Sequence, residues 1–289
     1  MQVKNTLYTT QLNSLKELWL HVTYQCNLTC THCLFSCSPT SEANELSLDA
    51  AISHVENALS IGIEKLYITG GEPFMWSKLE SFLTWYYKIP RAPLTILTNG
   101  TLIDDSKAAF LAKFHKQGLQ LRISLECYLK ENNDAVRGQG SFIKTTSAIR
   151  TLNSYGIYPW IAFTDKSNSA SCCNKELETA FKNTLSEQHS IRIAGLKIIS
   201  AYSKGRFAVS ANHSSSFTSS PFEMNPNVSG LQCGYGLTVC AEGIAPCPIL
   251  VDNKDVLHQG DLQDLIGNPI NLNHSCCENC LTSGTTCGQ

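Results

Sequence analysis

A regular alternation of short apolar segments with helical patterns occupies most of the chain between residues 17 and 200. The short segments are rich in β-branched and aromatic residues and lie at 17–23, 65–69, 94–98, 119–125, 157–163 and 191–199. The helical patterns between them lie at 47–62, 76–88, 105–117, 141–155 and 173–187. Strands this apolar indicate burial on both faces, as in a parallel sheet, and right-handed crossovers would curl six such units into part of a barrel. We therefore predict an α/β fold, a partial (β/α)6 barrel of the TIM type.

The composition changes beyond residue 209. Residues 210–230 are polar and rich in Ser and Asn, which is typical of a loop. Residues 231–289 combine short strand and turn patterns with frequent cysteines and have too few apolar residues for a separate core. A metal would supply the missing stability. We predict a barrel domain over 1–209 and a small cysteine-rich extension over 210–289 that binds a metal cluster.

Composition and charge restrict the function classes. Of the 289 residues, 43% are hydrophobic and 16% are charged, which is typical of a folded globular protein. The net charge of −2 and the lack of a Lys/Arg block argue against nucleic-acid binding. No apolar run reaches the roughly 18 residues that a membrane span needs, and the N-terminal residues lack the apolar core of a signal peptide. We therefore expect a cytoplasmic protein that binds neither nucleic acid nor membrane.

Fourteen cysteines are many for a reducing compartment, where clustered cysteines usually bind metals. They form an N-terminal group at 26, 30, 33 and 37, a middle group at 233, 240 and 247, and a C-terminal group at 276, 277, 280 and 287. Cys127, Cys172 and Cys173 are left over, and we interpret them as ordinary buried or loop thiols. The two dense groups near the ends of the chain predict two metal sites.

Two motifs follow the first two predicted strands. Cys26, Cys30 and Cys33 have the spacing C-x-x-x-C-x-x-C. Three thiolates can hold a four-iron cluster and leave one iron open, whereas a fourth thiolate from Cys37 would complete a zinc site. The second motif is Gly70-Gly71-Glu72-Pro73, in which the glycines allow a ligand close to the backbone and the carboxylate can accept from an ammonium group. Strand ends of this kind carry the chemistry in TIM-type barrels.

Together these two motifs resemble the radical S-adenosylmethionine (SAM) superfamily. Further matches are TNG at 98–100, RISLE at 122–126, the stretch 135–152 and SKGR at 203–206, so the resemblance covers nearly the whole chain. It implies that Cys26, Cys30 and Cys33 hold a [4Fe-4S] cluster whose open iron binds SAM. In this family, reductive cleavage of SAM gives a 5′-deoxyadenosyl radical that removes a hydrogen atom from the substrate.

The resemblance also implies which residues contact SAM. His32 would lie beside the adenine, Glu72 would accept from the ammonium group, and Arg137 would bind the carboxylate. Ser124 and Glu126 would face the ribose or the amino-acid end of SAM. For these two residues and Arg137, ordinary strand-end polarity is the alternative. The other cofactor-binding residues that the motifs imply are Gly70, Gly71, Pro73 and Asn99.

The C-terminal cysteines resemble the SPASM or twitch extensions of this family, which hold auxiliary iron–sulfur clusters. Cys233 precedes Gly243 and Cys247 with one residue fewer than the common spacing, and Cys277 and Cys280 form a C-x-x-C motif. The resemblance therefore implies one auxiliary [4Fe-4S] cluster on Cys233, Cys247, Cys277 and Cys280. The rivals for these positions are Cys240, Cys276 and Cys287. The alternative is a four-cysteine zinc ribbon.

A narrower resemblance is to radical SAM epimerases of ribosomally synthesised peptides, which share the segment from Cys26 to Ser41 with its Cys37-Ser38-Pro39-Thr40. In that mechanism the radical takes Hα from an L-residue and a cysteine thiol returns hydrogen from the opposite face. The expected double cysteine is Cys247-Pro248 here, so Cys240 and Cys276 are the candidate hydrogen-atom donors. Cys37 would mark the subgroup without binding the cluster, because a fourth thiolate would block the iron that SAM occupies.

Other hypotheses are thioether or carbon–carbon cross-linking of a peptide, chemistry on a small metabolite, and a non-catalytic zinc protein. The roughly sixteen residues before the first strand are too few for a peptide-recognition domain, which weakens the peptide hypotheses. We expect a peptide or small-molecule partner, and an electron donor such as flavodoxin or ferredoxin.

Overall fold

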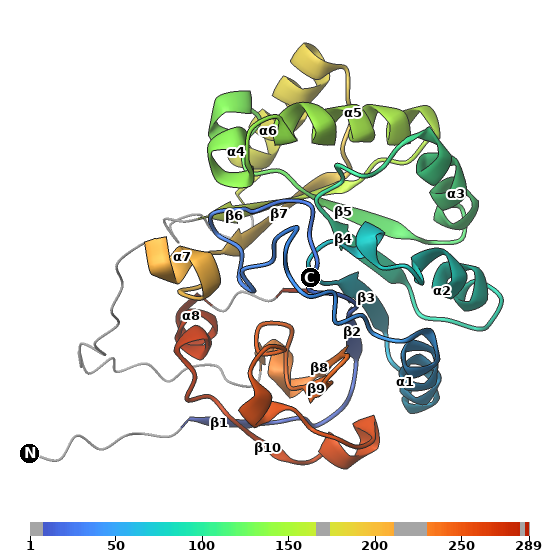
Figure 1. Ribbon diagram of the computed structural model, residues 1–289, viewed down its shortest axis with the longest axis vertical. Coiled ribbons are helices and arrows are strands. Elements are labelled where there is room, and N and C mark those ends of the chain that lie inside the picture. The colour runs from blue at the N-terminus through green and yellow to red at the C-terminus, as the bar shows by residue number, and fades with distance from the viewer. Residues whose placement is uncertain (1–7, 166–173, 211–229, 284–286, 289) are drawn as a thin grey trace, which may run out of the picture.

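The computed structural model describes residues 8–165, 174–210, 230–283 and 287–288, and its main feature is an eight-stranded sheet with the order β7-β6-β5-β4-β3-β2-β8-β9 (Figure 1). Neighbouring strands are parallel from β7 through to β8, whereas β9 is antiparallel to β8. The strands are β2 (Glu17–His21), β3 (Lys65–Thr69), β4 (Leu94–Thr98), β5 (Gln120–Ser124), β6 (Trp160–Asp165), β7 (Gly195–Ser200), β8 (Gly236–Cys240) and β9 (Gly243–Ala245). The predicted α/β fold with a parallel sheet is confirmed.

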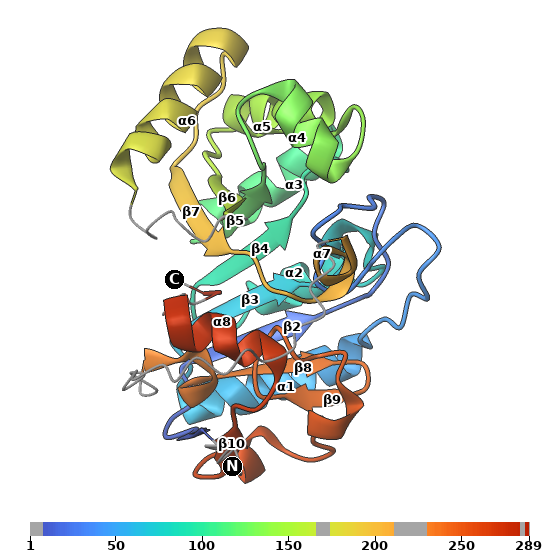
Figure 2. The ribbon, with the colours of Figure 1, turned by 90° about the vertical axis from the view of Figure 1, so that its left-hand side faces the viewer.

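Most of the helices cover the outer face of this sheet, whereas the last two helices, the N-terminal cysteine loop and the rest of the C-terminal region lie on the other side (Figures 1 and 2). The helices are α1 (Leu48–Ile61), α2 (Leu79–Tyr86), α3 (Asp105–His115), α4 (Lys130–Arg137), α5 (Ser141–Ser154), α6 (Lys175–His189), α7 (Gly205–Ser210) and α8 (Ser275–Ser283). α1 begins and ends where the sequence predicts. The hydroxyl of Ser47 accepts from the N–H of Ala50, and Gly62 closes the helix with a φ of 97°.

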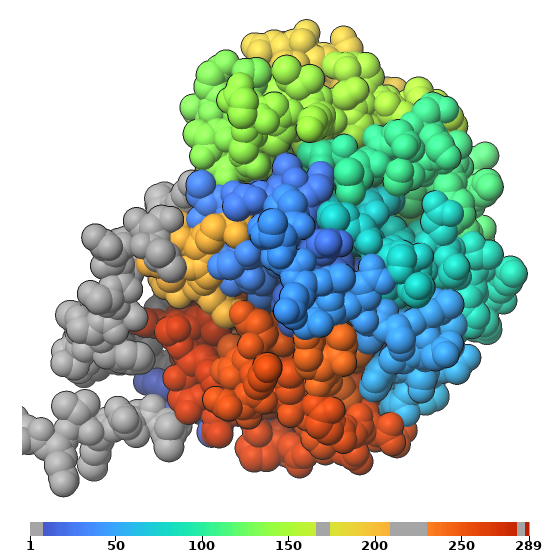
Figure 3. Space-filling model, viewed as in Figure 1, coloured from blue at the N-terminus to red at the C-terminus, as the bar shows by residue number. Residues whose placement is uncertain are grey.

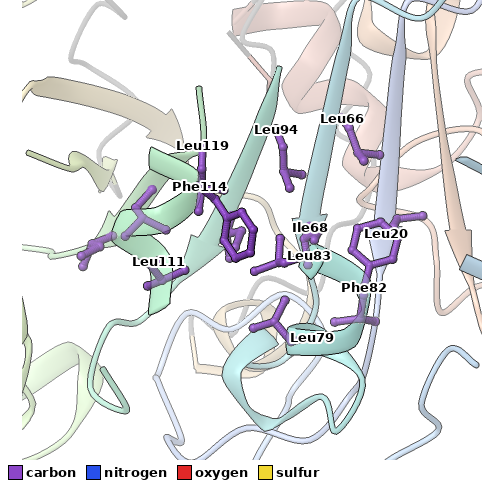
Figure 4. Close-up of a cluster of buried hydrophobic side chains, with 14 of the residues drawn as sticks. Leu20, Leu66, Ile68, Leu79, Phe82, Leu83, Leu94, Leu111, Phe114 and Leu119 are labelled. Atoms are coloured by element: carbon purple, nitrogen blue, oxygen red, sulfur yellow. The ribbon is translucent and has the colours of Figure 1, made fainter. Parts of the chain in front are cut away.

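The hydrophobic core lies between the helices and the outer face of the sheet. Figure 4 shows part of it, where side chains from three strands meet α2 and α3. The opposite face of the same strands is buried too, but it carries polar and aromatic groups such as Glu17, Trp19 and Tyr67. Alternate residues of a strand point to opposite faces, so each strand contributes one side chain to the core for each one that it turns inward.

Several boundaries differ from the prediction. The segment 76–88 forms α2 only from Leu79, after a short 3-10 turn at Pro73–Met75. The helix α4 was not predicted, because its residues KENNDAVR are almost entirely polar. Cys172, Cys173, the start of the expected helix at 173–187 and most of the expected loop at 210–230 lie outside the described residues.

The C-terminal region is more regular than the predicted short strands and turns. β8 pairs with β2 in parallel and thereby extends the main sheet, and α8 contains the C-x-x-C motif. A separate two-stranded sheet joins β1 (Thr9–Gln11) to β10 (Pro269–Asn271). The division of the chain at residue 209 stays a prediction. Within the described part of the chain, none of the helices has the length and apolar character needed to cross a membrane.

Candidate active site

A cavity of about 220 Å³ opens at the C-terminal ends of the parallel strands. Its wall includes Gly70 and Gly71 after β3, Asn99 after β4, and Ser124 at the end of β5. The remaining wall comes from β6, from the segment after β7, and from the loop that follows β2. Each strand of the predicted barrel therefore brings its chemistry-bearing end to one place, as the motifs predict.

The loop after β2 brings Cys26, Cys30, Cys33 and Cys37 to this cavity. Burial raises the pKa of Cys26 to about 12 and raises the pKa of Cys30 above its ordinary value. The neighbouring thiol of Cys37 lowers the pKa of Cys33 to about 5. Buried thiols in one cavity fit the ligands of a metal cluster, because positively charged iron can displace their protons.

The two glycines of the GGEP motif are required by the packing of this loop. A Cβ on Gly70 would lie 2.6 Å from the carbonyl oxygen of Thr23, and one on Gly71 would lie 2.3 Å from that of Gln25. The same backbones are joined by hydrogen bonds, from the N–H of Gly71 to Thr23 and from that of Glu72 to Gln25. The backbone that approaches these glycines is therefore the start of the cysteine loop itself.

Glu72 is fully buried, and its carboxylate ties two strand ends together. Oε1 accepts from the hydroxyl of Thr98 at 2.6 Å and from the N–H of Phe74 at 3.0 Å, and Oε2 accepts from the N–H of Asn99 at 2.8 Å. Burial raises the pKa of Glu72, although these three donors oppose the rise. Both oxygens thus have partners within the protein, and Glu72 does not line the cavity.

A buried charged network occupies the adjacent wall. Arg137 donates through Nε at 3.0 Å and through Nη2 to Oε1 of Glu126, and Nε2 of His32 lies 3.1 Å from the same oxygen. Burial alone would raise the pKa of Glu126, but Arg137 and His32 lower it to about 2. Arg137 also approaches Cys30, with Nη1 at 3.9 Å from Sγ. Nδ1 of His32 is buried and has no hydrogen-bond partner among the described residues, so it can meet a polar group of a ligand in the cavity.

The other predicted cofactor-binding residues are distributed around the same edge. Asn99 donates through Nδ2 to Cys26 at 3.8 Å and to Oδ1 of Asn27 at 2.9 Å. Ser124 lines the cavity. Pro73 is buried and begins the 3-10 turn that follows Glu72. Asn99 is therefore placed to orient the cysteine loop from the end of β4.

Arg206 and Gly205 belong to the site although the sequence analysis gave them no role. Arg206 donates through Nε to the carbonyl of Cys30 and through Nη2 to that of Cys37, each at 2.7 Å. Its backbone N–H donates to the carbonyl of Cys33. Gly205, with a φ of 58°, lies so close that a Cβ would be 2.2 Å from the same carbonyl. The SKGR stretch after the sixth predicted strand was the available signal, and its Gly-Arg pair holds the cysteine loop.

A second, smaller cavity lies in the C-terminal region and is lined by six cysteines. They are Cys233, Cys247, Cys276, Cys277, Cys280 and Cys287. The predicted auxiliary set of Cys233, Cys247, Cys277 and Cys280 is thus brought together, with Cys276 and Cys287 beside it. Burial raises the pKa of Cys233 and of Cys287 to about 12. Within the described ranges, no three His, Cys, Asp or Glu side chains are arranged to hold a single metal ion.

Cys287 is held in place from the interior of the sheet. Arg122 donates through Nη1 to the carbonyl of Cys287 at 2.7 Å and through Nη2 to that of Gly288. The N–H of Cys287 donates to Oε1 of Gln232, whose Nε2 donates to Glu17. Two of the inward-facing polar residues of the sheet therefore fix the last described residues of the chain.

Cys240 lies apart from both cavities. It is the last residue of β8, is 3% exposed, and donates through Sγ to the carbonyl of Gly243 at 3.4 Å. It packs with Ala245 and Val251. Of the two candidate hydrogen-atom donors, Cys276 is therefore the one beside the second cavity, and Cys240 is enclosed in the β8–β9 hairpin.

Comparison with known proteins gives one family and several relatives. A sequence model of the radical SAM superfamily matches residues 20–165. The antilisterial bacteriocin subtilosin biosynthesis protein AlbA of Bacillus subtilis is 32% identical over 142 residues, which is 49% of this chain and 31% of that protein. Mycofactocin maturase MftC of Mycolicibacterium smegmatis is 33% identical over 135 residues, which is 47% of this chain and 33% of that protein. The matched segment spans about a third of each relative.

Solved structures share the fold. Streptococcus suis SuiB bound to its precursor peptide SuiA has a TM-score of 0.65 at 15% identity, covering 89% of this chain and 65% of that chain. The structure of anSMEcpe with bound AdoMet and the Cp18Cys peptide has a TM-score of 0.58 at 20% identity, covering 87% of this chain and 78% of that chain. At these identities the likeness establishes a common architecture.

Proposed function

Because this chain belongs to the radical SAM superfamily, whose members use a [4Fe-4S] cluster and SAM, we propose that it removes a hydrogen atom from a ribosomally synthesised peptide. The observation that carries the proposal is the cavity at the strand ends, which collects three cysteines of the family spacing beside the GGEP, TNG and RISLE motifs. Two relatives are named for bacteriocin biosynthesis and for maturation, and SuiB binds a precursor peptide, which supports a peptide substrate.

In this proposal Cys26, Cys30 and Cys33 hold the cluster, which with SAM supplies the 5′-deoxyadenosyl radical when both are bound. The chain's own contribution is position and charge. Arg206 and the GGEP backbone fix the loop, and Arg137, charged and paired with Glu126, presents a cation for the SAM carboxylate. His32 offers its unpartnered Nδ1 to a polar edge of the adenine. The internal bonds of Glu72 support a structural contribution, so its contact to the ammonium group stays a prediction.

The second cavity supports the auxiliary cluster. Its ligands would be Cys233, Cys247, Cys277 and Cys280, all of which line the cavity. The six cysteines that line this cavity are two more than the four ligands that one cluster needs. One of the two remaining cysteines is thus free for another role, and Cys276, which packs directly beside Tyr202, is the preferred hydrogen-atom donor.

We propose L-to-D epimerisation as the outcome. The test is turnover in D₂O with the cognate peptide, an electron donor such as flavodoxin or ferredoxin, and SAM. We expect one deuterium at a single Cα and a D-residue after hydrolysis. Cys276→Ala should still form 5′-deoxyadenosine yet fail to return hydrogen to the peptide, whereas Cys240→Ala should behave as the wild type. A D-residue formed normally by Cys276→Ala would refute the donor assignment.

A second candidate is peptide cross-linking, and the closeness of the two cavities favours it, because an auxiliary cluster there could accept the electron that cross-linking releases. Mass spectrometry separates the two outcomes. Cross-linking removes two hydrogens from the peptide, whereas epimerisation in ordinary water leaves its mass unchanged. Anaerobic reconstitution with iron and sulfide tests the shared premise, since a zinc protein would form no 5′-deoxyadenosine with dithionite.

A further inference from the structure

Tyr202 stands between the two cavities. It follows β7, is 2% exposed, and lines the first cavity together with the neighbouring Ala201. The same side chain packs against Ile249, Leu250 and Cys276 on the side of the second cavity. One aromatic side chain therefore forms part of the partition between the proposed SAM site and the six-cysteine site.

The hydroxyl of Tyr202 is directed to the second site. Its oxygen lies 3.5 Å from Sγ of Cys280 and 3.9 Å from Sγ of Cys287, both within hydrogen-bonding distance for sulfur. A tyrosine hydroxyl is protonated near neutral pH and can donate, whereas a metal-bound thiolate has no proton and can only accept. When Cys280 is a cluster ligand, the hydrogen bond must therefore run from Tyr202 to sulfur.

The backbone around Tyr202 is anchored to both sites. The carbonyl of Ala201 accepts from Nδ2 of Asn279 in α8 at 3.1 Å, and the N–H of Ala201 donates to Asp165. Arg206, which lies four residues after Tyr202, holds the N-terminal cysteine loop through the carbonyls of Cys30 and Cys37. The short segment from Ala201 to Arg206 thus contacts both cysteine groups, and its position is set from both ends.

We propose that Tyr202 is a positioning residue that donates a hydrogen bond to Cys280, a cysteine ligand of the auxiliary cluster, and thereby sets the reduction potential of that cluster. The inference rests on the auxiliary cluster of the proposed function. Reduction adds negative charge to the cluster and its sulfurs, so a donor stabilises the reduced state more than the oxidised state. Tyr202 therefore makes the auxiliary cluster easier to reduce. In this proposal its location beside the SAM site favours electron transfer between the SAM-binding cluster and the auxiliary cluster.

The test is Tyr202→Phe in the full chain, reconstituted anaerobically with both clusters. We expect unchanged iron and sulfide content and an auxiliary-cluster potential that is more negative in an EPR-monitored redox titration. Loss of one charge-assisted hydrogen bond should change the reduction equilibrium about tenfold, which is about 59 mV for a one-electron couple. The potential of the SAM-binding cluster should not change.

Tyr86→Phe is the matched control. Tyr86 is also fully buried and donates its hydroxyl to the carbonyl of Ala92 at 2.7 Å, remote from the cysteines. The control should lose similar stability and keep both potentials. An unchanged auxiliary potential in a Tyr202→Phe protein with two clusters would overturn this inference alone. A wild-type protein that forms only the SAM-binding cluster would overturn the auxiliary assignment as well.

A second measurement needs no variant. Pulsed EPR of the reduced wild-type auxiliary cluster in H₂O and in D₂O should detect the exchangeable hydroxyl proton of Tyr202 beside a ligand sulfur, in addition to backbone N–H protons, and Tyr202→Phe should lack this one proton. If the wild-type spectrum lacks such a proton, Tyr202 does not donate to the cluster, and the inference is wrong.

Discussion

The two cysteine sites of this molecule are built in opposite ways. The first takes its cysteines from one loop, residues 26–37, whose carbonyl groups are bound by Arg206 and whose entry is bound by the GGEP backbone. The second takes its cysteines from four separate places, around 233 and 247, along α8, and at 287. The first is a local motif held by neighbours, whereas the second exists only when distant segments meet.

The surroundings of the two sites differ as well. The first lies beside the charged group of Arg137, Glu126 and His32 (the loop occupies the centre of Figure 3). The second has Leu231, Ile249 and Leu272 among its lining residues. The first site is therefore fixed by contacts to a single loop, whereas the second depends on the packing of several distant segments, which a bound cluster would join further. Four sets of variants test this difference, beginning with the largest expected effect.

Removal of one proposed ligand from each site should separate their functions. Cys30→Ala should lose the SAM-binding cluster and all detectable 5′-deoxyadenosine, because that cluster holds SAM. Cys280→Ala should lose only the auxiliary cluster and still cleave SAM. Iron analysis and chromatography of the products provide the measurement. Cys37→Ala is the control and should keep the SAM-binding cluster. Loss of that cluster in Cys37→Ala would show that Cys37 is one of its ligands.

A Gly→Ala substitution near each site should lower the free energy of unfolding strongly only at the first site. In Gly205→Ala the Cβ would meet the carbonyl of Cys33 at 2.2 Å, at a positive φ of 58°, and we expect a loss of about 3 kcal/mol in the free energy of unfolding. Gly234→Ala, next to Cys233, has its nearest neighbours at 3.6 Å and should lose less than about 1 kcal/mol. Equal losses in urea denaturation would contradict the greater constraint on the first loop.

Glu126→Gln should reveal the charged character of the first site through pH. The pKa of Glu126 is lowered from 4.5 to about 2, so its ionisation stabilises the fold above pH 4.5, and this contribution disappears as the pH falls through about 2. The variant should therefore be less stable by about 3 kcal/mol at pH 7. The difference from the wild type in urea denaturation should shrink between pH 4.5 and 3. Glu187→Gln, at an exposed position, should show no such trend.

Arg122→Gln should weaken the second site alone. Loss of the two donors to the carbonyls of Cys287 and Gly288 should destabilise the packing of these two residues, called the tail below, by about 2 kcal/mol. The backbone amides of the tail should then exchange with solvent faster. The SAM-binding cluster should be retained. Arg192→Gln is the control, because Arg192 is exposed and donates to the hydroxyl of Tyr158. A tail that stays protected from exchange in Arg122→Gln would show that Arg122 does not hold it.

Much of the fold could be predicted because strand periodicity and turn residues are local. α1 occupies the helical range 47–62 expected from the sequence, and the N-terminal cysteines and the glycines of GGEP line one cavity at the strand ends. β8 pairs with β2 from more than two hundred residues away, and no local pattern encodes that choice. The polar segment of α4 is helical because Asn133 and Asp134 are buried and bonded to Ser141, a tertiary effect.

In the candidate site, too, features set by local sequence could be predicted, whereas features set by tertiary contacts could not. The contact of Glu72 to the SAM ammonium group stays a prediction. The structure adds hydrogen bonds to its carboxylate from Thr98, Asn99 and Phe74, which are partners that only the assembled strand ends provide. The sequence could indicate Arg206 only as one residue of the SKGR stretch at 203–206. Its contribution to the site depends on carbonyl groups of a loop far earlier in the chain. The closeness of Cys287 to the other cysteines depends on Arg122, an inward-facing residue of a barrel strand.

The pairing of β2 with β8 has a consequence for synthesis of the protein. β2 gains one neighbour, β3, early in translation, but its other edge stays open until residues 236–240 leave the ribosome. β1 likewise waits for residues 269–271. An open strand edge beside an unloaded cysteine loop is prone to wrong association, and contacts this distant along the chain form slowly. The main sheet can therefore close at β2 only after residues 236–240 have been made, more than two hundred residues after β2 itself.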